Sequence, residues 1–139
     1  MDERKIMEIE YEMQNIIKQL KREKFRFFMS HAEVERLFEM VAQVGILAIR
    51  KSGDPYLNQL KGSWTGYEYG IPVLVDEGMY SFVVDITKKM GGTDPYTFAS
   101  KALAKAGNTF AVGALIELSK SGQKASRDIA KHYLDKINR

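Results

Sequence analysis

Apolar residues recur every three or four positions along most of this chain, which is the spacing of side chains on one face of an α-helix. The first such stretch predicts a helix from about Asp2 to the low twenties. Its apolar residues form an a/d heptad seam: Ile6, Ile9, Met13, Ile16 and Leu20. Two heptads are too few for an autonomous coiled coil. The seam therefore packs either within the chain or between two copies of it in a dimer.

The segment "KREKFRFF", residues 21–28, combines basic and aromatic residues after this helix. Basic side chains in the last turn of a helix interact favourably with the helix dipole. The sequence predicts that Phe25, Phe27 and Phe28 close the core at the turn. Aromatic residues mixed with Arg and Lys can also stack on nucleic-acid bases, which is the alternative interpretation.

The clearest helix signal follows Ser30. Ser30 and Glu33 match the S-x-x-E capping box, and Gly53 stands where a left-handed C-cap is expected. The helix between them has one apolar face, formed by Val34, Leu37, Phe38, Val41, Val44, Leu47 and Ala48. We expect this helix to be central to the fold. Asp54 and Pro55 then predict the start of a short helix.

The pattern changes in the middle of the chain. One set of alternate positions holds Tyr67, Tyr69, Ile71, Val73 and Val75, and a second holds Tyr80, Phe82, Val84 and Ile86. A period of two is typical of β-strands, and "DEGM" between the sets suits a tight turn. These features predict a β-hairpin with an edge at Pro72. The alternative is a helix over residues 79–90, because Met79, Phe82, Val83, Ile86 and Met90 also fit a helical period.

The C-terminal region predicts three helices. The first starts at Asp94 and Pro95 and ends at Gly107. The second is capped by Asn108, ends at Gly122 and is apolar nearly all round, so we expect it to be the most buried helix. A glycine within a helix costs about 1 kcal/mol relative to alanine. A close helix crossing at Gly113 would explain that cost. The third helix occupies the end of the chain.

These elements predict a single α+β domain of five to six helices with one inserted aromatic β-hairpin. Its regions are an N-terminal amphipathic helix and turn over 1–29, a helical spine and short helix over 30–61, the hairpin over 62–87 and the C-terminal helices over 94–139. A length of 139 residues with 45% hydrophobic residues suits one folded core. No cysteine is present, and no signal peptide or membrane-spanning run is visible, so we expect a cytoplasmic protein.

Charge is distributed unevenly and suggests one candidate site. The net charge is +3, and residues 100–139 hold eight basic and three acidic side chains. "SKSGQKAS" is a Ser/Gly linker that leads into a helix N-terminus, where N–H groups and cations favour anions. The candidate residues for an anion or nucleic acid are Ser119, Lys120, Ser121, Lys124, Arg127 and Lys131. A solvated helix face has the same pattern.

No motif indicates catalysis, a cofactor or a metal site, and the two histidines lack metal-ligand spacing. The leading hypothesis is therefore a non-enzymatic protein-interaction protein, such as an adaptor, inhibitor or regulator, that acts as a homodimer. Its composition would suit a phage or mobile-element accessory protein. Trp64, Tyr67 and Tyr69 are the candidate contacts for an unidentified protein partner. The alternative is binding of nucleic acid or a phosphorylated small molecule, and no membrane partner is expected.

Overall fold

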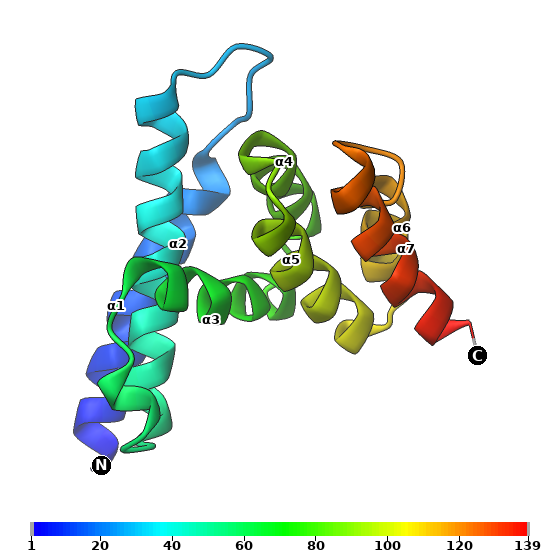
Figure 1. Ribbon diagram of the computed structural model, residues 1–139. Helices are drawn as coiled ribbons and strands as arrows, with labels where there is room; N and C mark the ends of the chain where they lie inside the picture. Colours follow the sequence, from blue (N-terminus) through cyan, green and yellow to red (C-terminus); the bar gives the residue numbers. More distant parts are fainter. Residues whose placement is uncertain (1, 139) are drawn as a thin grey trace. The chain divides into compact units, whose positions relative to one another are not determined.

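The computed structural model describes residues 2–138. All regular secondary structure in this part of the chain is helical, and it contains no β-strand (Figure 1). The helices are α1 (Glu3–Arg22), α2 (His31–Ser52), the 3-10 turn η1 (Leu57–Gln59), α3 (Ser63–Asp76), α4 (Tyr80–Met90), α5 (Thr93–Ala106), α6 (Thr109–Leu118) and α7 (Lys124–Ile137). The chain divides into two compact units, of which the first ends at Val73 and the second begins at Leu74.

In the first unit, α1 and α2 form an antiparallel helical hairpin joined by residues 23–30 (Figure 1). The predicted capping box is confirmed: the Ser30 hydroxyl accepts from the Glu33 N–H, and the Glu33 carboxylate accepts from the Ser30 N–H. Gly53 adopts a left-handed conformation with φ of 69° and ends α2 as predicted. Asp54 accepts from the N–H groups of Tyr56 and Leu57, so the expected short helix is the single turn η1.

Three glycines bring α2 and α3 into close contact. A Cβ atom at Gly45 of α2 would overlap the carbonyl oxygen of Gly66, and one at Gly66 would overlap the carbonyl oxygen of Ala42. A Cβ atom at Gly70 would overlap the carbonyl oxygen of Val41. The two α3 glycines are four residues apart, so they lie on one helical face and let the backbones approach. The close crossing that we predicted at Gly113 is therefore found at these glycines instead.

The predicted β-hairpin over 62–87 is wrong, because these residues form α3 and α4. The buried positions 66, 67, 70, 71, 74 and 75 recur with a helical period once the glycines are counted as packing residues. The predicted hairpin rested on the alternate positions 67, 69, 71, 73 and 75, which include neither Gly66 nor Gly70. Pro72 removes the N–H that would bond the Glu68 carbonyl, but both residues are exposed, so water can satisfy that carbonyl.

The turn at "DEGM" joins two helices rather than two strands. Gly78 has φ of 76°, its N–H donates to the Val75 carbonyl, and the Met79 N–H donates to the Leu74 carbonyl. This pair of bonds is a Schellman motif, in which a left-handed glycine ends a helix. The alternative helix over 79–90 is confirmed, since α4 covers Tyr80–Met90.

The second unit contains α4 to α7. Of these helices, α5 and α6 each pack against the other three. Its core consists of Phe82, Val83 and Ile86 of α4, Tyr96 and Leu103 of α5, Leu115 and Leu118 of α6, and Ala130 of α7. The Ser126 hydroxyl of α7 donates to the Gly91 carbonyl at 2.9 Å, which ties the start of α7 to the end of α4. In the described residues, no helix is both long and apolar enough to cross a membrane.

Candidate protein-interaction surface

The α6 helix begins where the sequence predicts. The Asn108 carboxamide oxygen accepts from the Ala111 N–H at 2.9 Å, which satisfies one of the unpaired donors at the helix start. The helix ends at Leu118, four residues before Gly122, because residues 119–121 form turn bonds back to its last carbonyls.

One side of α6 is exposed although the helix is apolar nearly all round. Ala111, Ala114, Leu115 and Leu118 pack into the core. On the other side, Phe110 is 75% exposed and Ile116 is 40% exposed. Gly113 lies between them, and a Cβ atom there would meet no other atom within 4 Å. The prediction that α6 is the most buried helix is therefore wrong. We call Phe110, Gly113 and Ile116 the α6 face.

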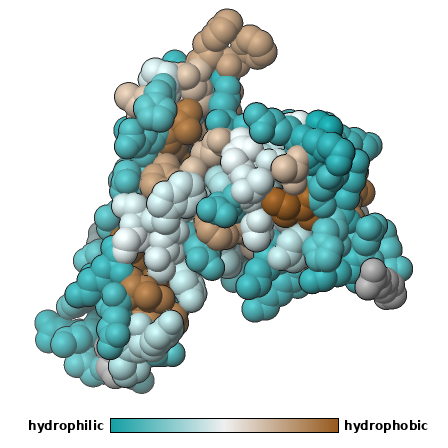
Figure 2. All heavy atoms as spheres, viewed as in Figure 1, coloured by the Kyte–Doolittle hydropathy of each residue, from teal (hydrophilic) through white to brown (hydrophobic). Residues whose placement is uncertain are grey.

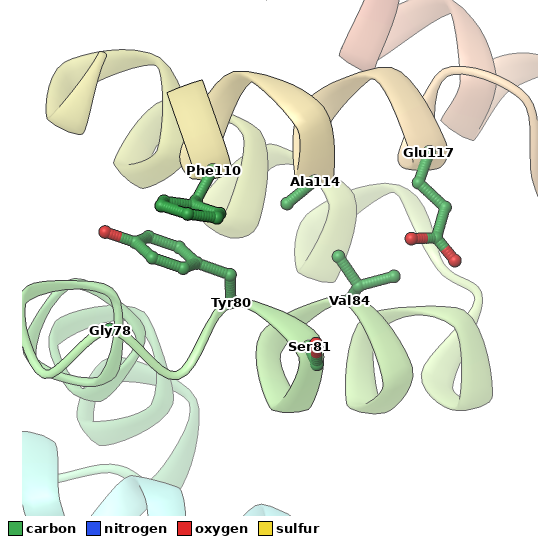
Figure 3. Close-up of a pocket in the computed structure, with 7 residues that line it drawn as sticks. All are labelled: Gly78, Tyr80, Ser81, Val84, Phe110, Ala114 and Glu117. Carbon is green, nitrogen blue, oxygen red and sulfur yellow. The ribbon is translucent and has the colours of Figure 1, made fainter. Parts of the chain in front are cut away.

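An aromatic pair adjoins the α6 face. The Tyr80 ring of α4 and the Phe110 ring stack with centroids 6.4 Å apart and planes inclined by 14°. The Asn108 amide donates to the Tyr80 hydroxyl at 2.8 Å, so the residue that caps α6 also holds the tyrosine in place. Figure 3 shows the two rings facing each other at one end of a groove between α4 and α6.

The groove has a volume of about 340 Å³ and is lined by Gly78, Tyr80, Ser81, Val84, Phe110, Ala114 and Glu117. Val84 and Ala114 face each other across its middle, and Glu117 reaches in from the end opposite the rings (Figure 3). The lining is thus aromatic at one end, aliphatic in the middle and acidic at the other. Such a groove suits an apolar side chain better than a polar substrate.

The acidic end of the groove is partly neutralised. Glu117 pairs with Lys88 of α4 at 3.0 Å. Burial raises the pKa of Asp85, with a further upward contribution from Glu117 that Lys88 and Lys89 oppose. These groups form a small charged cluster of two carboxylates and two ammonium groups.

The structure does not bring the predicted anion-site hydroxyls together. Ser119 is buried and donates to the Ile116 carbonyl at 2.5 Å. The Ser121 hydroxyl bonds the Tyr96 hydroxyl at 3.0 Å. Both groups therefore satisfy contacts inside the second unit.

The basic residues of the predicted anion site are divided between a turn and a helix. Lys120 lies between α6 and α7, whereas Lys124, Arg127 and Lys131 belong to α7. Lys124 pairs with Asp128 at 3.0 Å, and this hydrogen bond lowers the pKa of Asp128. Arg127 donates to the Gly122 carbonyl at 2.6 Å, and Lys131 is exposed. The arrangement is typical of a solvated helix face.

The predicted partner contacts lie in different environments. Tyr67 is fully buried, Tyr69 is half-buried, and Trp64 is 51% exposed. Phe38 of α2 stacks on Tyr67, with ring centroids 4.9 Å apart. It also contacts Trp64 edge to face, with ring centroids 5.2 Å apart. This aromatic cluster fixes α3 on α2: Tyr67 is a core residue, Phe38 is half-buried, and the Trp64 ring is the most exposed of the three.

The predicted dimer seam packs largely within the chain. Ile9, Met13 and Leu20 are buried together with Ile17, and Ile6 and Ile16 are half-buried. The α1 residues face α2 of the same hairpin. The exposed apolar side chains of α1 are Met7 and Tyr11, outside the seam.

Sequence reasoning missed Tyr80, Phe110 and Ile116 as surface residues. The available signal was the length of α6: ten apolar-rich residues cannot all face one core of a small unit. Residues 2–138 contain no cluster of three or more His, Asp or Glu side chains that could hold a metal ion. Comparisons with protein-family models, with curated proteins and with solved structures found no match.

Proposed function

We propose that this chain is a non-enzymatic protein-interaction protein that forms a homodimer through the α6 face. The observation that carries the proposal is that an almost wholly apolar helix leaves Phe110 and Ile116 exposed. A helix that is hydrophobic all round is normally buried, and exposed apolar patches mark interaction sites. The stacked Tyr80 ring and the groove beside it extend this apolar surface.

The spacing of the α6 face favours a second copy as the partner. Phe110 and Ile116 each lie three residues from Gly113, on opposite sides along the helix. In an antiparallel crossing of two α6 helices on a two-fold axis at Gly113, Phe110 of each copy would lie opposite Ile116 of the other. The open position at Gly113 would let the two backbones approach closely.

An adaptor, inhibitor or regulatory role in the cytoplasm is part of this proposal. The alternative, binding of nucleic acid or a phosphorylated molecule by α7, has less support. Lys124 and Arg127 already bond Asp128 and the Gly122 carbonyl, and these contacts compete with a phosphate. Of the features that suggested a dimer, the a/d seam is largely buried against α2, and residues 63–90 form α3 and α4 in place of the predicted β-hairpin. The α6 face takes their place.

Light scattering after size-exclusion chromatography at micromolar concentration tests the homodimer. We expect a molar mass of about twice the 15.9 kDa of one chain. Phe110→Ser should weaken the dimer at least a hundredfold. Burial of one phenyl ring contributes about 1.5–3 kcal/mol, and the symmetric interface contains two such rings.

Tyr11→Ser is the matched control, because Tyr11 is an exposed aromatic residue of the first unit. It should leave the molar mass unchanged. A monomer at all concentrations would contradict self-association. A dimer that survives Phe110→Ser combined with Ile116→Ser would show that another surface mediates it.

A further inference from the structure

The most exposed large apolar side chains in the described residues are Phe27 and Phe28, at 86% and 84%. They lie in the loop that joins α1 to α2, at the end of the helical hairpin (Figure 1). In Figure 2, apolar side chains project from this end of the hairpin. The prediction that these phenylalanines close the core is therefore wrong for Phe27 and Phe28, whereas Phe25 is half-buried. We call residues 21–28 the hairpin tip.

The hairpin tip is strongly basic. Residues 21–28 contain four basic side chains, Lys21, Arg22, Lys24 and Arg26, and one acidic side chain, Glu23. Glu23 pairs with Arg36 of α2 at 2.8 Å, and Arg26 pairs with Glu33. Arg22 and Lys24 are exposed.

The charge changes sign along α1. Residues 2–12 contain five acidic and two basic side chains, whereas residues 18–28 have a net charge of +4. On α2 the order is reversed, because residues 31–39 beside the hairpin tip hold three acidic side chains and one basic side chain, and Arg50 and Lys51 lie at the far end. Residues 18–39 together therefore have a net charge of +2, with the positive charge concentrated in the hairpin tip, and an anionic surface would attract it.

We propose that the hairpin tip inserts Phe27 and Phe28 into the interface of an anionic lipid bilayer. The two adjacent rings lie exposed in the loop at the end of the hairpin, where they can enter a deformable medium. Phenyl rings carry no hydrogen-bonding group that hydrocarbon would leave unsatisfied. The flanking cations would lie at the level of the anionic headgroups, an arrangement that gives reversible surface attachment without a membrane-spanning segment.

Nucleic acid fits the hairpin tip less well. The Phe27 and Phe28 rings contact each other edge to face, with centroids 4.7 Å apart and planes inclined by 89°. A strand of successive stacked bases requires ring faces that are open and similarly oriented. The perpendicular pair does not provide such a platform.

Sedimentation of the full chain with lipid vesicles tests the proposal. One set of vesicles contains only phosphatidylcholine, and the other contains about 30% phosphatidylserine. We expect binding to the anionic vesicles alone, which decreases as the salt concentration rises. Phe27→Ser with Phe28→Ser should weaken this binding at least tenfold. Met7→Ser, an exposed apolar residue at the opposite end of α1, should not weaken it.

A second measurement reports insertion directly. Phe28→Trp in a Trp64→Phe background places the sole tryptophan in the hairpin tip, and its emission should shift to shorter wavelength on anionic vesicles. The proposal is overturned if neither vesicle binds, or if anionic binding is unchanged in the double-serine variant. It is also overturned if the tryptophan emission stays constant, or if single-stranded DNA but not vesicles binds in a Phe27-dependent manner.

Discussion

Gly66 is a residue whose lack of a side chain determines how two helices pack. Its position lies against the carbonyl oxygen of Ala42, a backbone atom that cannot move independently of α2. Gly66→Ala should therefore lower the free energy of unfolding by about 2–3 kcal/mol, because overpacking of a helix contact usually costs about 1–3 kcal/mol. Urea denaturation followed by circular dichroism measures the change.

Gly113→Ala is the matched control, since it is the same substitution within a helix but at a position with open space. It should raise the free energy of unfolding by up to about 1 kcal/mol through the higher helix propensity of alanine. Equal effects at Gly66 and Gly113 would contradict the close crossing of α2 and α3.

Asp85 connects stability to pH. Burial holds the pKa of Asp85 above its ordinary value in the folded protein, so the folded state binds this proton more tightly than the unfolded chain does. The resulting stabilisation is present below the unfolded pKa of about 4 and is lost as the pH rises through the folded pKa. Asp85→Asn should therefore be more stable than the parent at pH 7 and equally stable at pH 3. A parent protein that is the more stable of the two at pH 7 would show that Lys88 outweighs the burial.

Asn108 stabilises the start of helix α6, because its side-chain oxygen caps the helix and its amide donates a hydrogen bond to the Tyr80 hydroxyl. Asn108→Ala should cost about 1 kcal/mol of stability, the usual effect of losing an N-cap. Asn108→Ser keeps a capping oxygen but is too short to reach the Tyr80 hydroxyl. Thermal denaturation should give the serine variant a melting temperature close to that of the parent. Equal decreases in both variants would show that the hydrogen bond to Tyr80, rather than the helix cap, provides the stability.

The helices could be predicted from the sequence where polar and apolar faces are distinct. Ser30, Glu33 and Gly53 mark the ends of α2 correctly because their capping contacts are local. The error at α3 has a tertiary cause. Gly66 and Gly70 weaken a helix in isolation, and they are compensated by close contact with α2 at Val41, Ala42 and Gly45, which lie more than 20 residues earlier in the chain. A local pattern does not contain that contact.

The candidate surface could be predicted only in part for a similar reason. The sequence identifies α6 as apolar nearly all round, but it does not say whether its own chain covers every side. In the structure, Phe110 and Ile116 of this helix are exposed. The predicted site at the basic residues of α7 did not include their contacts with Asp128 and the Gly122 carbonyl, which form when the turn and helix form.

At the scale of the molecule, the two proposed surfaces belong to different compact units. The hairpin tip lies in the unit that ends at Val73, and the α6 face lies in the unit that begins at Leu74. We therefore expect substitutions of exposed residues at one surface to leave the packing of the other unit unchanged. This separation allows the two proposals to be tested on one set of variants.

The double variant Phe27→Ser with Phe28→Ser should lose vesicle binding and still have the dimer's molar mass. The double variant Phe110→Ser with Ile116→Ser should become a monomer and keep its preference for anionic over neutral vesicles. Its apparent affinity should decrease, because a monomer presents one hairpin tip where a dimer presents two. Light scattering and vesicle sedimentation on both variants measure these properties. If the hairpin-tip variant were monomeric, self-association would depend on Phe27 and Phe28, and the assignment of the dimer interface to α6 would be wrong.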